Sequence, residues 1–100
     1  MYYNNNTLVF LNGNWVKASE ANVSLYNQGM HYGSSVFEGI RSYATPDGTR
    51  VFKSEEHYER LHYSAKKMFL ELSYSTEELT HLTYQLLEKN NLSNAYIRPL

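Results

Sequence analysis

The chain has 100 residues, of which 42% are hydrophobic and 19% charged, and it contains no cysteine. This composition is that of one ordinary folded domain without disulfides or thiolate metal sites. The formal net charge is −1 and the longest basic run is Lys66-Lys67, so the charge favours neither nucleic acid nor anionic lipid as a partner. The N-terminus lacks the basic start and apolar stretch of a signal peptide or membrane span, and we therefore expect a cytoplasmic protein.

Two β-hairpins are expected in the first half of the chain. Asn12 and Gly13 lie between two short apolar runs, and Asn-Gly in this setting is a strong signal for a tight hairpin, here over residues 7–17. Apolar and aromatic residues recur through residues 33–44, and a Pro-Asp-Gly turn at 46–48 precedes another apolar pair. This pattern indicates a second hairpin.

A first helix is expected to begin at Ser54 and to continue to about Phe69. The Ser54 hydroxyl can cap the helix, and the two glutamates that follow it favour the positive end of the helix dipole. Burial of one face would provide most of the stability of this helix, because propensity alone is marginal at this length. The residues expected on the buried face are Tyr58, Leu61, Ala65, Met68 and Phe69.

A second helix is expected to begin at the capping box formed by Ser75 and Glu78. It is expected to end near Asn90 and Asn91, because asparagine tolerates the left-handed conformation common at helix C-termini. Residues 95–100 are predicted to form a strand that returns to the sheet. The residues expected to face inward from the second helix are Leu79, Leu82, Leu86 and Leu87.

The predicted order is hairpin, hairpin, helix, helix, strand. It indicates an α+β fold in which two helices pack on one face of a mainly antiparallel sheet. No repeat or linker divides the chain, so we expect residues 1–100 to form one domain.

Arginines are the strongest candidates for anion binding, because a guanidinium group can hold a carboxylate or phosphate at two points. Arg41 and Arg98 lie in mostly apolar and aromatic strands, where an unpaired charge is costly, and a structural salt bridge is the alternative for both. Arg60 lies in the first helix, where pairing with Glu56 at the surface is the alternative to binding a ligand. Arg50 follows a turn and is expected to be solvated.

The other polar residues indicate no defined catalytic constellation. His57 and His62 are five positions apart, which places them on different helix faces, and no metal site is expected. His31 beside Gly33 could act in acid-base chemistry or fill the core. Glu38 is either a general base or a structural partner, the more common role of a single carboxylate in a strand. The residues taken singly therefore indicate a small α+β domain with an anion pocket.

Six segments stand in a characteristic order: residues 31–43 (HYGSSVFEGIRSY), 51–52, 57, 60–62, 64–66 and 95–100 (AYIRPL). In this order they closely resemble the N-terminal part of branched-chain amino-acid aminotransferases, which are pyridoxal 5′-phosphate enzymes of fold type IV. The resemblance covers nearly the whole chain. It implies transfer of an amino group between L-leucine, L-isoleucine or L-valine and 2-oxoglutarate, with the cofactor as electron sink.

The resemblance also implies the roles of individual residues. Arg60 matches the arginine that binds the cofactor phosphate in the family. Phe37 and Gly39 match residues that line the pocket for the substrate side chain, where the glycine leaves room for branching. Tyr96 and Arg98 match an inner pair, of which Arg98 is expected to meet the second carboxylate of glutamate.

The resemblance also has implications for assembly, for Arg41 and for the small-molecule partners. Tyr32 matches a tyrosine that reaches into the pocket of the neighbouring subunit, which implies a homodimer or larger homo-oligomer with a shared site. Arg41 is expected to support the pocket. The amino acids and 2-oxo acids of the reaction are the expected small-molecule partners.

The lysine that holds the cofactor as a Schiff base lies, in the family, in a second half that is absent from this sequence. None of the five lysines stands in a matching motif, so no catalytic residue is assigned within the chain. We expect residues 1–100 to be the small N-terminal domain of a longer enzyme and to be inactive alone. The alternatives are a D-amino-acid aminotransferase, an aminodeoxychorismate lyase, or a non-catalytic domain for anion binding or dimerisation.

Overall fold

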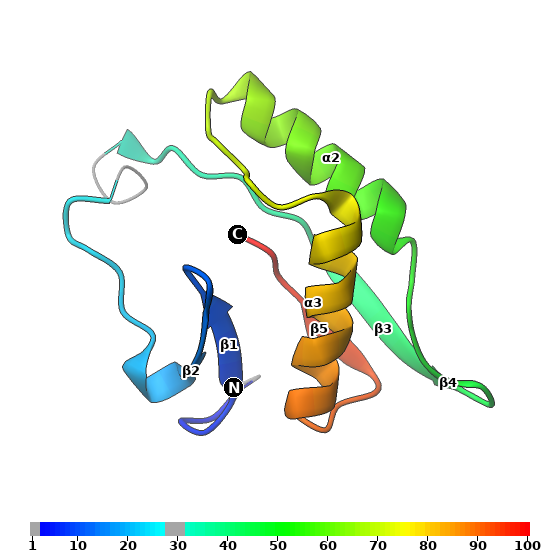
Figure 1. Ribbon diagram of the computed structural model, residues 1–100. Helices are drawn as coiled ribbons and strands as arrows, with labels where there is room; N and C mark the ends of the chain where they lie inside the picture. The colour runs from blue at the N-terminus through cyan, green and yellow to red at the C-terminus, as the bar shows by residue number, and fades with distance from the viewer. Residues whose placement is uncertain (1–2, 28–31) are drawn as a thin grey trace.

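The computed structural model describes residues 3–27 and 32–100, and its helices and strands confirm the predicted α+β class (Figure 1). The strands pair antiparallel in two separate sheets, one with the order β1-β2 and one with the order β4-β3-β5. The elements are β1 (Leu8–Leu11), β2 (Asn14–Lys17), a short 3-10 helix η1 (Ala18–Glu20), β3 (Ile40–Thr45), β4 (Gly48–Val51), α2 (Ser54–Lys67), α3 (Thr76–Lys89) and β5 (Ala95–Ile97).

The hairpin of β1 and β2 confirms the prediction for residues 7–17. Asn12 and Gly13 both have positive φ, at 50° and 84°, as the two-residue turn that matches the twist of a hairpin requires. The Asn90 side chain accepts a hydrogen bond from the Leu8 amide at 2.7 Å and donates one to the Leu8 carbonyl at 2.9 Å. These bonds tie the hairpin to the end of α3, and it stays apart from the three-stranded sheet.

The second hairpin forms from β3 and β4, but its first strand begins only at Ile40 and not at residue 33. The pairing of β3 with β5 places Ile40 opposite Ile97. Two residues upstream, the Glu38 amide donates to the Pro99 carbonyl at 3.1 Å. Proline has no amide hydrogen to return the bond, so the ladder ends there.

The start of α2 differs from the prediction. The N-cap is Lys53, which has a left-handed conformation with φ 53° and makes no side-chain capping bond. The Ser54 hydroxyl instead forms a hydrogen bond of 2.7 Å with the Thr80 hydroxyl of α3. Ser54 therefore joins the two helices rather than capping one of them.

The end of α2 also comes earlier than expected. Phe69 takes a left-handed φ of 57°, and the Leu70 amide bonds back to the Ala65 carbonyl at 2.8 Å, which is the pattern of a Schellman motif. The turn directs the two apolar residues after the helix outward, so Met68 is 46% and Phe69 96% exposed. Their predicted burial is wrong, whereas the other three residues of that face are buried.

The boundaries of α3 agree closely with the prediction. The Ser75 hydroxyl accepts from the Glu78 amide at 3.0 Å, and the Glu78 carboxylate accepts from the Ser75 amide at 3.1 Å. At the other end Asn90 is the C-cap, and Asn91 takes the left-handed conformation with φ 53°. The expected capping box and asparagine C-terminus are therefore confirmed.

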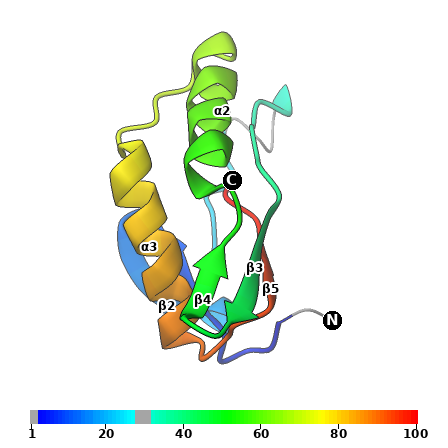
Figure 2. The ribbon, with the colours of Figure 1, turned by 90° about the vertical axis from the view of Figure 1, so that its right-hand side faces the viewer.

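Both helices pack on one face of the three-stranded sheet, as Figure 2 shows, and the core lies between these layers. The Tyr58 hydroxyl forms a buried hydrogen bond with the Thr83 hydroxyl, and burial raises the pKa of Tyr58. Thr83 consequently takes a buried place on α3. Of the four leucines predicted to face inward only Leu87 is buried; Leu79, Leu82 and Leu86 are half-buried, and Leu79 and Leu86 pack against the core. The buried cluster is formed by Ile40, Tyr58, Leu61, Leu87 and Ile97.

Each helix has 14 residues, whereas a helix that spans a bilayer needs about 20. Within residues 3–27 and 32–100, neither has the length and apolar character for a membrane crossing.

Candidate functional site

Most residues of the expected site lie in or against the extended segment 36–43. Its side chains alternate between the interior and solvent, as the period of two in extended backbone requires. The buried positions are Glu38, Ile40 and Ser42, and the exposed positions are Phe37, Gly39, Arg41 and Tyr43. The segment therefore has an inner face toward α2 and an outer face that carries rings and an arginine.

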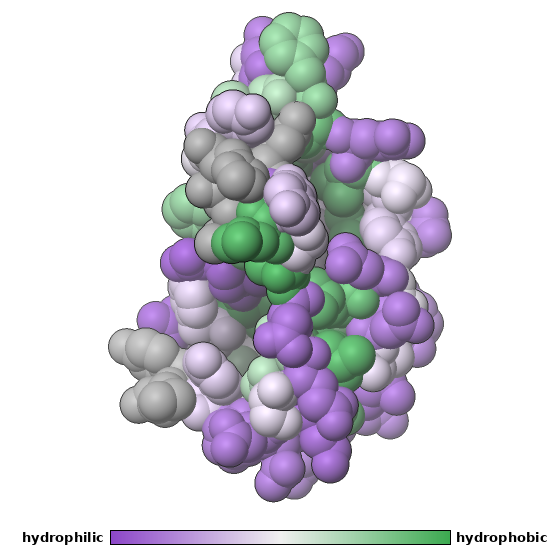
Figure 3. Space-filling view, turned by 90° about the vertical axis from the view of Figure 1, so that its left-hand side faces the viewer, coloured by the Kyte–Doolittle hydropathy of each residue, from purple (hydrophilic) through white to green (hydrophobic). Residues whose placement is uncertain are grey.

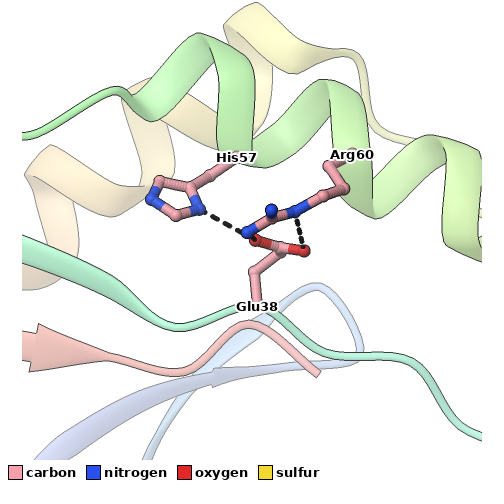
Figure 4. A network of polar contacts seen from close by, with 3 residues as sticks. All are labelled: Glu38, His57 and Arg60. Atoms are coloured by element: carbon pink, nitrogen blue, oxygen red, sulfur yellow. Dashed lines mark hydrogen bonds and ion pairs between the residues drawn. The ribbon is translucent and has the colours of Figure 1, made fainter.

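On the inner face, the Glu38 carboxylate lies against two side chains of α2, as Figure 4 shows. Arg60 donates from Nε to Oε2 at 2.9 Å and from Nη2 to Oε1 at 2.8 Å. His57 Nδ1 lies 2.8 Å from Oε1. Because an ionised carboxylate only accepts hydrogen bonds, Nδ1 carries the hydrogen in this contact.

These contacts determine the charge state of Glu38. The hydrogen bonds from Arg60 lower the pKa of the carboxyl group, burial opposes them, and the bond from His57 lowers the pKa further. The carboxylate in turn raises the pKa of Arg60. A carboxylate with a lowered pKa is a weak base, so Glu38 acts here as a structural partner, and Arg60 pairs with Glu38 rather than with Glu56.

Arg60 retains donors for a ligand. A guanidinium group has five N–H bonds, of which Glu38 occupies one on Nε and one on Nη2. The Arg60 side chain is 66% exposed, whereas Glu38 is only 6% exposed. The guanidinium therefore has one edge on the buried carboxylate and can offer its remaining N–H groups to an anion.

On the outer face, aromatic rings and arginines form a second cluster. Arg98 donates from Nη2 to the Tyr96 hydroxyl at 2.8 Å, and its Cζ atom lies 4.4 Å from the centre of the Phe37 ring. The guanidinium groups of Arg98 and Arg41 lie 5.5 and 5.6 Å from the centre of the Tyr96 ring. Cation–π contacts of this kind hold the two arginines and two rings together.

Gly39 lies directly against this cluster. A Cβ atom at this position would be 2.6 Å from the Tyr96 hydroxyl oxygen, which is far inside van der Waals contact. The room that the glycine leaves is therefore occupied here by the Tyr96 ring.

The structure thus brings Phe37, Gly39, Tyr96 and Arg98 together, with Arg41 beside them, and places Arg60 apart. Arg60 contacts Glu38, whose side chain points to the face opposite that of its neighbour Phe37. The two expected anion-binding arginines therefore lie on opposite sides of one extended segment.

Further expectations from the sequence concern Tyr32, His31, Arg50 and a metal site. Tyr32 is 80% exposed, and His31 lies outside the described residues. Arg50 is exposed and donates to the Thr49 carbonyl at 3.2 Å. The described part of the chain contains no group of three residues suited to a metal ion.

The partnership of Glu38 and His57 with Arg60 was not anticipated from the sequence. His57 and Arg60 are one helical turn apart, but their common partner lies far upstream. The available signal was the alternation around Glu38, which assigns an acidic residue to a buried position and so requires a basic partner.

Comparison with known proteins reveals close relatives. The chain is 45% identical over 92 residues to the branched-chain-amino-acid aminotransferase of Escherichia coli K12, covering 92% of this chain and 30% of that protein. It is 42% identical over 90 residues to the putative branched-chain-amino-acid aminotransferase of Methanocaldococcus jannaschii, covering 90% of this chain and 30% of the relative. The chain thus spans about 30% of the length of these curated relatives.

Solved structures show the same similarity. A crystal structure of the Escherichia coli branched-chain amino acid aminotransferase superposes with a TM-score of 0.87 at 42% identity, covering 92% of this chain and 31% of that one. The Thermobaculum terrenum enzyme in its PLP-form (holo-form) superposes with a TM-score of 0.76 at 27% identity, covering 94% and 32%. The expected resemblance is therefore confirmed. The sequence model described as "Amino-transferase class IV" matches residues 35–100, which is most of the chain, and the protein belongs to this family of class IV aminotransferases.

Proposed function

We propose that this chain is the small N-terminal domain of a pyridoxal-phosphate-dependent branched-chain aminotransferase. The reaction moves an amino group between L-leucine, L-isoleucine or L-valine and 2-oxoglutarate. The observation that carries the proposal is that the exposed Arg60 and the Phe37–Tyr96–Arg98 cluster lie on opposite sides of one extended segment. Relatives that are similar to the chain bear the name of this activity.

The cofactor contact that this chain offers is with the phosphate group. Pyridoxal phosphate, when bound, supplies the electron sink for amino transfer. Arg60 fits a phosphate because its guanidinium is exposed and keeps N–H donors that Glu38 does not use. The Thermobaculum terrenum enzyme is described in its PLP-form, which supports the same cofactor. The lysine that holds the cofactor lies beyond residues 1–100 in this proposal.

The outer face provides contacts for two kinds of substrate. The Phe37 ring is 55% exposed and can pack against a branched aliphatic side chain. The Arg98 guanidinium rests on the rings of Phe37 and Tyr96, from which it can pair with the second carboxylate of glutamate. One surface thereby accepts an apolar side chain or a charged one.

The large exposed apolar residues support the assignment to a larger assembly. Phe37, Phe52, Phe69 and Leu100 are between 55% and 96% exposed, and the face drawn in Figure 3 shows hydrophobic patches between hydrophilic ones. Such surface is typical of contacts with another domain or subunit. In the proposal, Tyr32 reaches into the site of a second copy, the protein is a homo-oligomer, and its location is the cytoplasm.

The test uses the protein expressed from the full reading frame that encodes this chain. We expect turnover of L-leucine with 2-oxoglutarate, and little turnover of D-alanine or aminodeoxychorismate. Residues 1–100 alone, checked for folding by circular dichroism, are expected neither to transaminate nor to retain pyridoxal phosphate. A reading frame that stops after Leu100, or turnover of leucine by the short chain, would contradict the proposal; the former would favour a non-catalytic domain.

A further inference from the structure

Glu38 is a buried charge that amino transfer itself does not explain. Its side chain is 6% exposed, and burial of a carboxylate is costly unless it is paired and hydrogen-bonded. Three hydrogen bonds from α2 satisfy it, two from Arg60 and one from His57. The fold therefore maintains a costly group at this position, beneath the arginine assigned to the cofactor phosphate.

The contact constrains Arg60 strongly. A long side chain that is 66% exposed would otherwise sample many rotamers. Two parallel hydrogen bonds to a carboxylate fix both the position and the plane of a guanidinium group. The Glu38 carboxylate is itself held by His57 and by its burial, and its backbone amide is bonded to Pro99.

We propose that Glu38 is a positioning residue for Arg60. Its carboxylate occupies the Nε and Nη2 edge of the guanidinium and thereby directs the remaining N–H groups to the cofactor phosphate, while His57 holds the carboxylate in place. The inference rests on the proposed function, because it takes Arg60 as the phosphate ligand.

Charge and geometry predict opposite effects for the same substitution. Glu38→Gln removes a negative charge that repels the phosphate and partly offsets the positive charge of Arg60. If Arg60 acted only as a point charge, the phosphate would therefore bind more strongly. The same substitution replaces one acceptor oxygen by an NH₂ group, which cannot accept from Arg60. If positioning dominates, the affinity for pyridoxal phosphate falls.

The experiment measures the dissociation constant of pyridoxal phosphate, by equilibrium dialysis, for the protein expressed from the full reading frame. We expect E38Q to weaken retention on the order of 10-fold, the scale seen when a residue that orients a ligand group is removed. Tighter or unchanged binding by E38Q would overturn the inference. Thermal unfolding of the cofactor-free variants checks that they are folded.

A double-mutant cycle separates positioning from a general structural effect. In the R60A background, E38Q is expected to have no further effect on the dissociation constant, because the residue that Glu38 positions is absent. Equal losses in both backgrounds would refute the positioning role. If R60A itself retains the cofactor normally, the proposed function of Arg60 fails; if R60A weakens retention and E38Q does not, only the positioning inference fails.

His57 provides a second pair of variants that does not alter Glu38. H57N keeps an amide N–H near the place of Nδ1 and is expected to retain the cofactor nearly as well as the unmodified protein. H57A removes this donor and is expected to weaken retention several-fold. Equal retention by H57A and H57N would contradict the role of His57, and this pair keeps the inference testable if E38Q does not fold.

Discussion

Replacing Gly39 by alanine is expected to disturb substrate recognition while leaving the fold intact. The added Cβ would lie 2.6 Å from the Tyr96 hydroxyl oxygen and 3.2 and 3.3 Å from two ring carbons. Ordinary contact for a Cβ begins at 3.4 Å, so the hydroxyl would have to retreat by about 0.8 Å (3.4 minus 2.6). The ring can do so, because Tyr96 is 50% exposed.

The cost falls on the contact between Tyr96 and Arg98. A retreat of this size strains their hydrogen bond of 2.8 Å and shifts the guanidinium expected to meet glutamate. A misplacement of about 1 Å can cost on the order of 100-fold in rate, so we expect kcat/KM for glutamate to fall between about 10-fold and 100-fold. The free energy of unfolding is expected to change little. The steric cost in the folded state is offset because alanine restricts the unfolded chain more than glycine does, an effect that stabilises by about 0.4–1 kcal/mol.

The assay compares steady-state kinetics with glutamate and with leucine, and thermal unfolding, for the protein from the full reading frame. Tyr96→Phe supplies the matched background, because it removes the closest atom while keeping the ring. G39A is expected to cost less in Y96F than in the unmodified protein. Unchanged kinetics of G39A, or the same loss in both backgrounds, would refute the steric reasoning.

Three further predictions concern stability. Leu87→Ala is expected to lower the free energy of unfolding by about 2–5 kcal/mol, because Leu87 is 3% exposed. Leu25→Ala is the control and is expected to change it little, because Leu25 is 69% exposed. Equal losses for the two variants in urea denaturation would contradict the assignment of Leu87 to the core. Ser75→Ala is expected to cost about 1 kcal/mol by the same measurement, since it removes the helix cap, and no loss would argue against the capping box. Acid is expected to destabilise the protein more than its E38Q variant. The pKa of Glu38 is lowered in the folded state, so as the pH falls the unfolded chain takes up the proton first. The stabilisation present at neutral pH is therefore lost as the pH falls below the ordinary pKa of 4.5 and through the lower pKa of the folded state. If the melting temperatures of the two proteins changed in parallel from about pH 3 to pH 7, this prediction would be contradicted.

Features with local causes were predicted well. The turn at Asn12 and Gly13, the capping box of Ser75 and Glu78, and the left-handed Asn91 each depend on residues at most three positions apart. Their hydrogen bonds form within one turn of backbone, so the residue types are sufficient to predict them.

Features with a distant partner were predicted poorly. Ser54 has the residue type of a cap, but Thr80 competes for its hydroxyl. Phe69 matches the apolar spacing of α2, but the helix ends before it and the turn exposes it. Thr83 is polar and was not expected in the core, where the hydroxyl of Tyr58 provides its partner.

The sequence by itself determined the order and type of the elements, the α+β class and, through its motifs, the family. The resemblance to the family also indicated the residues of the outer face, whereas their alternation with buried positions became visible only in the structure. Only the tertiary structure decided that Glu38 and His57 hold Arg60 and that the Tyr96 ring fills the space at Gly39. The physical reason is that these contacts join residues 19 to 57 positions apart, which meet only when α2 and β5 pack against the segment around β3.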